Sequence, residues 1–216
     1  GIHVIRYVNG EKMKFPEGVY LFHTESLKDQ YFDEFVADLN VHGIKASVHS
    51  RREPGLYACN EWLIPTSIVA GVSAGFLNEA GKDLYQVAKS KLAELCTATI
   101  KKPRIEPVLI GSEGKINNNN PFSSGFSIYS ETNMGCTFKL LIPKYSAQID
   151  YNKIVHAYLD FLKDYNDGIV SKIDIGLDLS TILPSSTILV HYNESTKSIE
   201  WLDHLPAHVR EGMRTV

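Results

Sequence analysis

The sequence predicts an α/β protein whose mostly parallel sheet is flanked by helices. Three observations support this fold class. Short apolar runs of strand length alternate with amphipathic helical segments over 17–111, and the loops between them are short. The 216 residues are 44% hydrophobic and 22% charged, which is enough apolar material for a sizeable core. Antiparallel hairpins are expected at both ends of the chain.

The first elements are expected to be a hairpin and then strand, helix, strand. Apolar residues at even spacing before Asn9-Gly10 predict the hairpin over 2–15. The apolar run 18–24 predicts a strand, and alternation over 44–49 predicts another. The helix between them, over 25–43, is predicted by residues that recur every four positions: Leu27, Tyr31, Phe35 and Leu39.

The middle of the chain is expected to continue the alternation of strands and helices. A buried strand is predicted over 67–73, because Pro65 would interrupt a helix through the surrounding apolar segment. An apolar stripe over 78–96 predicts a helix, and 103–111 predicts another short buried strand. We expect these strands to be parallel, with helices on both faces of the sheet.

The second half has a different pattern. Residues 112–125 are polar and predict a loop, 126–143 predict two strands, 150–166 predict a helix, and 186–203 predict a hairpin. Because no linker of low hydrophobicity separates the halves, we expect one α/β domain over 1–216, in which 112–216 extends the sheet.

Composition limits the classes of function. The net charge of −3 provides no basic surplus for nucleic acid, and no apolar run is long enough to span a membrane. Three scattered cysteines indicate reduced thiols and a cytoplasmic protein, and no His/Cys spacing predicts a metal site. The chain begins with Gly1, so we expect a module of a longer protein. A homo-oligomer is the other expected state.

Three polar loops are expected to meet in one cleft. They span 23–26, 50–57 and 75–83, and each follows a predicted strand. In a doubly wound sheet, ligands bind beyond the carboxyl ends of the strands. The loops offer the following polar side chains: His23, Thr24, Glu25, Arg51, Arg52, Tyr57, Asn78, Glu79 and Asp83.

Residues 17–111 resemble a TIR domain, a family with a flavodoxin-like α/β fold. The resemblance is carried by "VYLFHTESLKDQYFDEFVADLNVHGIKASVHSRREPG", by "LIPTSIVAGVSAGFL" and by "RIEPVLIG". Its most specific feature is the Pro54-Gly55 loop. The sequence "FLNEAGKD" departs from the aromatic and cysteine group that usually precedes the glutamate of TIR enzymes. The second half also differs from the usual TIR ending.

The resemblance implies cleavage of the nicotinamide–ribose bond of NAD, with NAD as substrate and no other cofactor. Glu79 would stabilise the oxocarbenium-like ribose, and Asp83 is the second candidate for this role. Arg51 and Arg52 would hold the diphosphate through charge-assisted hydrogen bonds. Tyr57 or Trp62 would stack on a ring of the ligand, and His23 and Thr24 are the remaining candidate ligand-binding residues.

Each candidate also has a structural interpretation. Glu79 near a helix start would complement the helix dipole, and Arg51 and Arg52 would belong to a solvated loop. Three functions therefore stay open. They are an NAD-cleaving module of a larger bacterial stress or defence protein, a non-catalytic TIR-like module that self-associates, and a nucleotide sensor that binds without cleavage.

Overall fold

Seven strands form one mixed sheet, in the order β4-β3-β5-β6-β7-β8-β9. The computed structural model describes residues 7–8, 11–12, 15–52, 66–105, 120–183, 186–205 and 207–214. The strands of the sheet are β3 (Val19–Thr24), β4 (Ala46–Arg51), β5 (Ile68–Val72), β6 (Phe122–Glu131), β7 (Thr137–Pro143), β8 (Thr187–Asn193) and β9 (Ser198–Trp201). The predicted N-terminal hairpin pairs β1 (Tyr7–Val8) with β2 (Glu11–Lys12).

Helices flank this sheet, which confirms the predicted α/β class. They are α1 (Gln30–Val41), α2 (Ala74–Glu79), α3 (Lys82–Ile100), α4 (Tyr151–Asn166) and α5 (Ala207–Arg214). Short 3-10 turns lie at Glu25–Leu27, Pro103–Ile105 and Ile173–Ile175. No helix in the part of the chain that the structure describes is long and apolar enough to cross a membrane.

Side-chain caps set the starts of three helices. The Asp29 carboxylate accepts a hydrogen bond from the backbone N–H of Tyr31 at 3.0 Å, so α1 begins one residue after Asp29. Asp150 caps α4 and Ser73 caps α2 in the same manner. Each cap satisfies an N–H group that would otherwise have no partner in the first turn.

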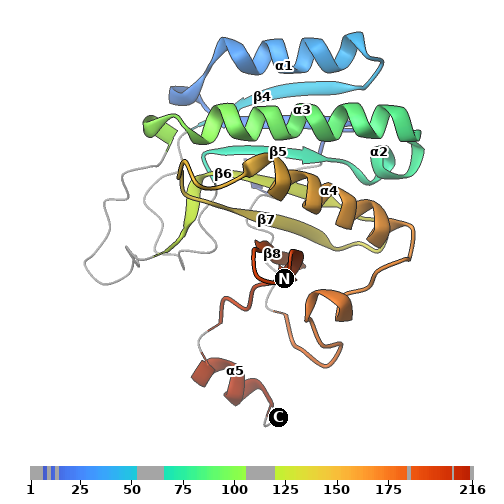
Figure 1. Cartoon of the computed structure of the whole chain (residues 1–216), viewed down its shortest axis with the longest axis vertical. Helices are drawn as coiled ribbons and strands as arrows, with labels where there is room; N and C mark the ends of the chain where they lie inside the picture. The colour runs from blue at the N-terminus through green and yellow to red at the C-terminus, as the bar shows by residue number, and fades with distance from the viewer. Residues whose placement is uncertain are drawn as a thin grey trace.

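Helices α1, α3 and α4 lie in one layer over one face of the sheet (Figure 1). Their buried side chains and every second residue of the strands form one continuous core. On β3, Val19 and Leu21 point into this core, whereas Tyr20 and Phe22 point to the opposite side and join a smaller aromatic cluster. We call the side turned away from α1, α3 and α4 the second face. Helices were predicted on both faces of the sheet, but α1, α3 and α4 all lie on the same face.

Parallel and antiparallel pairs alternate across the sheet. β3 is parallel to β4, β5 to β6, and β7 to β8, whereas the pairs β3/β5, β6/β7 and β8/β9 are antiparallel. The expectation that β5 would run parallel to β3 is therefore wrong. The chain leaves β4 and enters β5 at the same end of the strands, because Arg51 pairs with Thr24 and Ile68 pairs with His23. If β5 were parallel to β3, the chain would have to cross over to the opposite end of the strands before entering β5.

Other predicted elements are confirmed in part. The two strands over 126–143 are β6 and β7, the hairpin over 186–203 is β8 and β9, and all four strands extend the same sheet. The predicted loop 75–83 instead contains α2 and the start of α3. Of the predicted strand 103–111, the part that the structure describes is a 3-10 turn.

Candidate functional site

The cleft expected between Arg51 and Glu79 is not formed. Arg51 ends β4 at the edge where β3 also ends. Glu79 is the last residue of α2, which follows β5. The end of β5 lies at the opposite end of the strands from Arg51, because Val72 pairs with Val19 at the start of β3. The antiparallel direction of β5 therefore separates the two predicted partners by the length of the strands.

The surroundings of Glu79 and Asp83 are open to solvent. Both side chains are exposed, and Asp83 lies in the first turn of α3. Glu79 lines a shallow hollow of about 390 Å³ together with Glu17 and Lys45. Glu17 accepts a hydrogen bond from the Ser73 hydroxyl at 3.3 Å. This hollow holds two carboxylates and one exposed ammonium group, and no arginine of the second loop reaches it.

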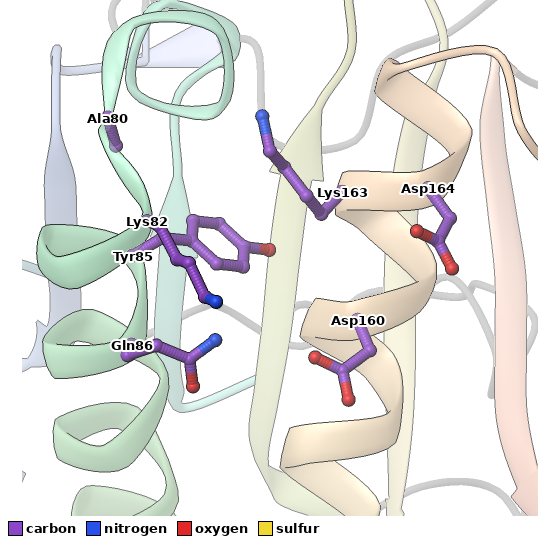
Figure 2. A pocket seen from close by; sticks show the side chains of 7 residues that line it. All are labelled: Ala80, Lys82, Tyr85, Gln86, Asp160, Lys163 and Asp164. Carbon is purple, nitrogen blue, oxygen red and sulfur yellow. The ribbon is translucent and has the colours of Figure 1, made fainter.

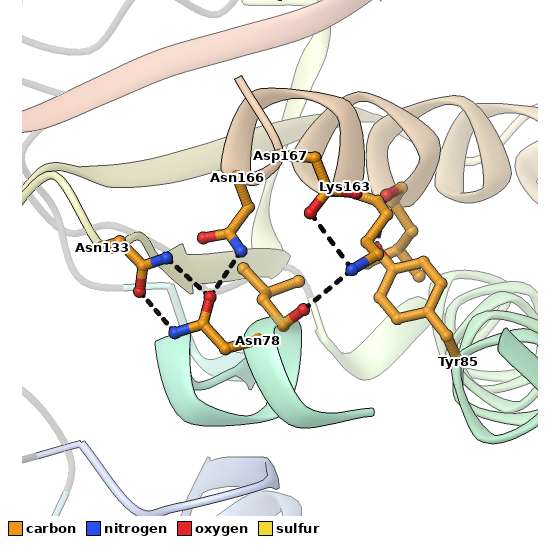
Figure 3. A network of polar contacts seen from close by, with 8 residues as sticks. Asn78, Tyr85, Asn133, Lys163, Asn166 and Asp167 are labelled. Carbon is orange, nitrogen blue, oxygen red and sulfur yellow. Dashed lines mark hydrogen bonds and ion pairs between the residues drawn. The ribbon is translucent and has the colours of Figure 1, made fainter. Parts of the chain in front are cut away.

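Hydrogen bonds to neighbouring elements fix the position of α2 (Figure 3). Asn78 donates to the Asn133 Oδ1 at 2.5 Å, and the Asn78 Oδ1 accepts from Asn133 and Asn166 at 2.6 Å each. Lys163 donates to the carbonyl oxygen of Leu77 at 3.2 Å. These contacts tie α2 to the β6–β7 turn and to the end of α4. Asn78, a predicted cleft residue, therefore has a structural role.

A second hollow of about 470 Å³ lies between α3 and α4 (Figure 2). Acidic and basic side chains alternate around it. The Tyr85 hydroxyl donates to the carbonyl oxygen of Leu159, and Lys89 is paired with Asp160 at 2.7 Å. The lining contains two lysines and two aspartates, so the hollow has no net charge that would favour an anion or a cation. Its lining residues are Ala80, Lys82, Tyr85, Gln86, Asp160, Lys163 and Asp164.

The two predicted residues at the end of β3 point to opposite sides. The His23 ring packs at 5.4 Å from the Phe32 ring, on the helix side, and His23 is buried. Thr24 lies on the second face, where it pairs with Arg51. Arg52 follows Arg51 and is exposed. Because successive side chains of a strand point to opposite faces, His23 cannot share a site on the sheet with Arg51. Tyr57, Trp62 and the Pro54-Gly55 loop lie outside the described residues.

A row of residues crosses the second face on four adjacent strands. Strand pairing aligns Lys139 with Tyr129, Tyr129 with Gly71, and Gly71 with Tyr20. Gly71 leaves room for the Tyr20 ring, whose nearest atom lies 2.3 Å from the position that a Cβ at residue 71 would occupy. Tyr20 therefore extends over β5 toward the phenol of Tyr129.

Lys139 is the buried cation in this row. It is 6% exposed, and its Nζ lies 5.6 Å from the centre of the Tyr129 ring. Within the described parts of the chain, no carboxylate lies at ion-pair distance from Lys139. Burial, and secondarily the positive charge of Arg51, lower the pKa of Lys139 to about 8.

Arg51 acts on the same group of side chains from the edge of the sheet. Burial raises the pKa of Tyr129, and the Arg51 charge opposes this rise. Arg51 is therefore close enough to affect both Tyr129 and Lys139 electrostatically. The Glu131 carboxylate also affects this face, because its charge adds to the effect of burial in raising the pKa of Tyr20.

Two hydroxyl groups of the second face are buried without a hydrogen-bond partner. They are the Tyr20 hydroxyl and the Thr24 Oγ1, in residues that are 0% and 1% exposed. Buried polar groups are nearly always hydrogen-bonded, so each of these hydroxyl groups can accept a bound water or a ligand oxygen as its partner. Donors of this kind beside an arginine and a lysine suit the oxygens of a phosphate group.

Of the residues on this face, the sequence predicted Arg51 and Thr24 as candidate site residues and did not single out Lys139, Tyr129 or Tyr20. A signal was available for Lys139, since it is the one charged residue inside the apolar strand "TFKLLIP". A lysine in such a strand requires a reason, because a charge without a partner is costly to bury. We define the second-face cluster as Tyr20, Thr24, Arg51, Tyr129 and Lys139.

Comparison of the chain with protein-family models, with curated proteins and with solved structures gave no match. The resemblance to TIR domains therefore stays a prediction. Within the described ranges, no group of three or more His, Cys, Asp or Glu side chains could hold a metal ion.

Proposed function

We propose that this chain is a binding module that recognises a phosphate-bearing nucleotide at the second-face cluster and does not cleave it. The observation that carries the proposal is the placement of Arg51 and Lys139 on one sheet face, together with the two buried hydroxyl groups of that face. Arginine and lysine side chains are the usual binders of phosphate oxygens.

The side chains around the cluster suit a nucleotide better than a bare anion. The Phe15 and Tyr20 rings stack at 5.4 Å, and the Phe22 and His49 rings stack at 4.9 Å. These rings, of which Phe15, Tyr20 and Phe22 are buried, form an apolar aromatic surround for the cluster, and the arginine provides paired donors for phosphate oxygens.

The alternative of NAD cleavage by Glu79 has weaker support. That chemistry requires the acid near the ribose while the arginine holds the diphosphate of the same molecule. The sheet separates the two groups, and Glu79 is exposed. Binding without cleavage requires only the second-face cluster.

Calorimetric titration with NAD and with pyrophosphate tests the proposal. We expect both probes to bind the wild-type chain. Arg51→Gln should weaken binding about 10- to 100-fold, because a charge-assisted hydrogen bond contributes about 1.5–3 kcal/mol. Lys45→Gln removes the same charge at the opposite edge of the sheet, where Lys45 is exposed, and should change affinity less than about twofold.

Two outcomes would contradict the proposal. One is equal loss of affinity in Arg51→Gln and Lys45→Gln, which would indicate a general charge effect. The other is release of nicotinamide that disappears in Glu79→Gln, which would restore the cleavage function. Far-ultraviolet circular dichroism of each variant checks that the fold is retained.

A further inference from the structure

Helix α5 is attached to the domain differently from the other helices. Helices α1 to α4 each contribute buried apolar side chains to the core on the helix side of the sheet. Among the α5 side chains that the structure describes, none belongs to that core or packs against it. Figure 1 shows α5 apart from the layer of α1, α3 and α4. The attachment of α5 must therefore depend on contacts other than core packing.

The Arg210 side chain supplies the polar part of this attachment. Arg210 is only 8% exposed, although it lies in α5. Its Nε and Nη2 donate to the two oxygens of the Asp203 carboxylate at 2.9 and 2.7 Å. Its Nη1 donates to the carbonyl oxygen of Ile182 at 2.5 Å. Paired hydrogen bonds of this kind are directional and strong, because the planar guanidinium matches the carboxylate.

The same guanidinium lies over the ring of Trp201. Its central carbon is 5.8 Å from the centre of the ring, which is the distance of a cation–π contact. Trp201 is the last residue of β9, and its side chain packs against the core. Arg210 thus connects α5 to the end of the outermost strand of the described sheet.

An element attached in this way is expected to open at a lower free energy than the core. Local opening is favoured where a segment has few buried apolar contacts, because little apolar surface must be exposed. We propose that α5 opens as a unit, separately from the rest of the domain, and that Arg210 holds the closed form over Trp201. In the open form, the Trp201 ring and the Asp203 carboxylate are accessible to solvent. This inference goes beyond the proposed function and does not depend on the second-face cluster.

Hydrogen exchange followed by mass spectrometry tests the proposal on the whole chain. In the wild type, the amides of α5 should exchange faster than those of α4, after correction for intrinsic rates. Arg210→Ala should raise exchange in α5 at least about tenfold, because it removes the charge-assisted hydrogen bonds. Exchange in α4 should stay unchanged. Glu211→Ala alters an exposed neighbour on the same helix and should change α5 exchange less than about twofold.

The fluorescence of Trp201 provides a second measurement. With Trp62→Phe in all proteins compared, Trp201 is the single tryptophan of the chain. Arg210→Ala should shift its emission to longer wavelength and increase its quenching by acrylamide. Arg210→Lys keeps the charge but loses the paired donors, so we expect it to resemble Arg210→Ala.

Three results would overturn the inference. The first is exchange of α5 as slow as that of α4 in the wild type, which would mean that α5 opens only when the whole domain unfolds. The second is an equal effect of Arg210→Ala and Glu211→Ala on α5. The third is an equal rise in α4 and α5 exchange in Arg210→Ala, which would make Arg210 a support of the entire fold.

Discussion

Single residues of the second face carry most of the functional argument. Strand alternation alone sends His23 into the helix-side core and Thr24 to the second face, although they are neighbours in the sequence. It also makes Arg51 part of the second face. Two residues can therefore share a site on a sheet only when their side chains point to the same face, whatever their residue types.

The buried charge of Lys139 predicts an unusual dependence of stability on pH. The pKa is about 8 in the folded chain and near 10.4 in an unfolded one, so the unfolded state binds more protons between these values. Stability should therefore rise with pH in this window, by about 2 kcal/mol between pH 7 and pH 9.5. Urea unfolding at both pH values, in a buffer without phosphate, measures this change.

Lys139→Met provides the matched comparison. It removes the buried charge and keeps the apolar length, so we expect it to be more stable than the wild type at pH 7 by about 1–3 kcal/mol. The difference should shrink as the pH approaches 9.5. Parallel curves for the two proteins would mean that Lys139 does not titrate in this range.

At the scale of elements, the direction of β5 decides which side chains can meet. An apolar segment of five residues identifies a strand equally well in either direction, because the side chains alternate in both. What reverses β5 is the return of the chain to the edge that it had just left at Arg51. The expected cleft between Arg51 and Glu79 required β5 to run parallel to β3.

Distance measurement between two spin labels tests the direction of β5. With the native cysteines replaced by serine, labels at Arg52→Cys and Glu79→Cys should lie farther apart than about 20 Å, since six strand residues span roughly that length. Double electron–electron resonance measures this distance. A separation below about 15 Å would place Glu79 near Arg51 and would favour the cleavage function again.

Helix α2 shows how a short element can fix the position of a loop residue. Most of its residues fall in the predicted loop 75–83, and the helix was predicted to start only at 78, because the segment lacks the long apolar stripe that identifies a helix. Its start depends on the Ser73 hydroxyl, and its position depends on asparagines 55 and 88 residues away along the chain. Contacts of that range have no local signal in the sequence.

At the scale of the whole molecule, one core connects both halves of the chain. It extends from Val19 on β3 to Ile199 on β9, and α3 packs between α1 and α4 within it. The strands after residue 111 belong to the same sheet as those before it. A core shared in this way predicts that the two halves unfold together.

Thermal unfolding tests this expectation. Far-ultraviolet circular dichroism reports the helices, and near-ultraviolet circular dichroism reports the packing of aromatic side chains on both faces. We expect the two signals to give one coincident transition. Two separate transitions would indicate that the halves are stable independently. Repeating the scan with pyrophosphate should move the single transition to higher temperature, since the ligand prefers the native state.

Local patterns in the sequence predict the α/β class, the strands β3 to β5, the helices α1 and α4 and both later hairpins, because these depend on periodicities and turn residues within short windows. The functional roles of Arg51 and Thr24 stay predictions. Only the tertiary structure decided that β5 is antiparallel to β3, that Glu79 lies at the far edge, and that Arg51 shares a face with Lys139. Strand direction and neighbour order arise from contacts between distant segments, so no local pattern encodes them.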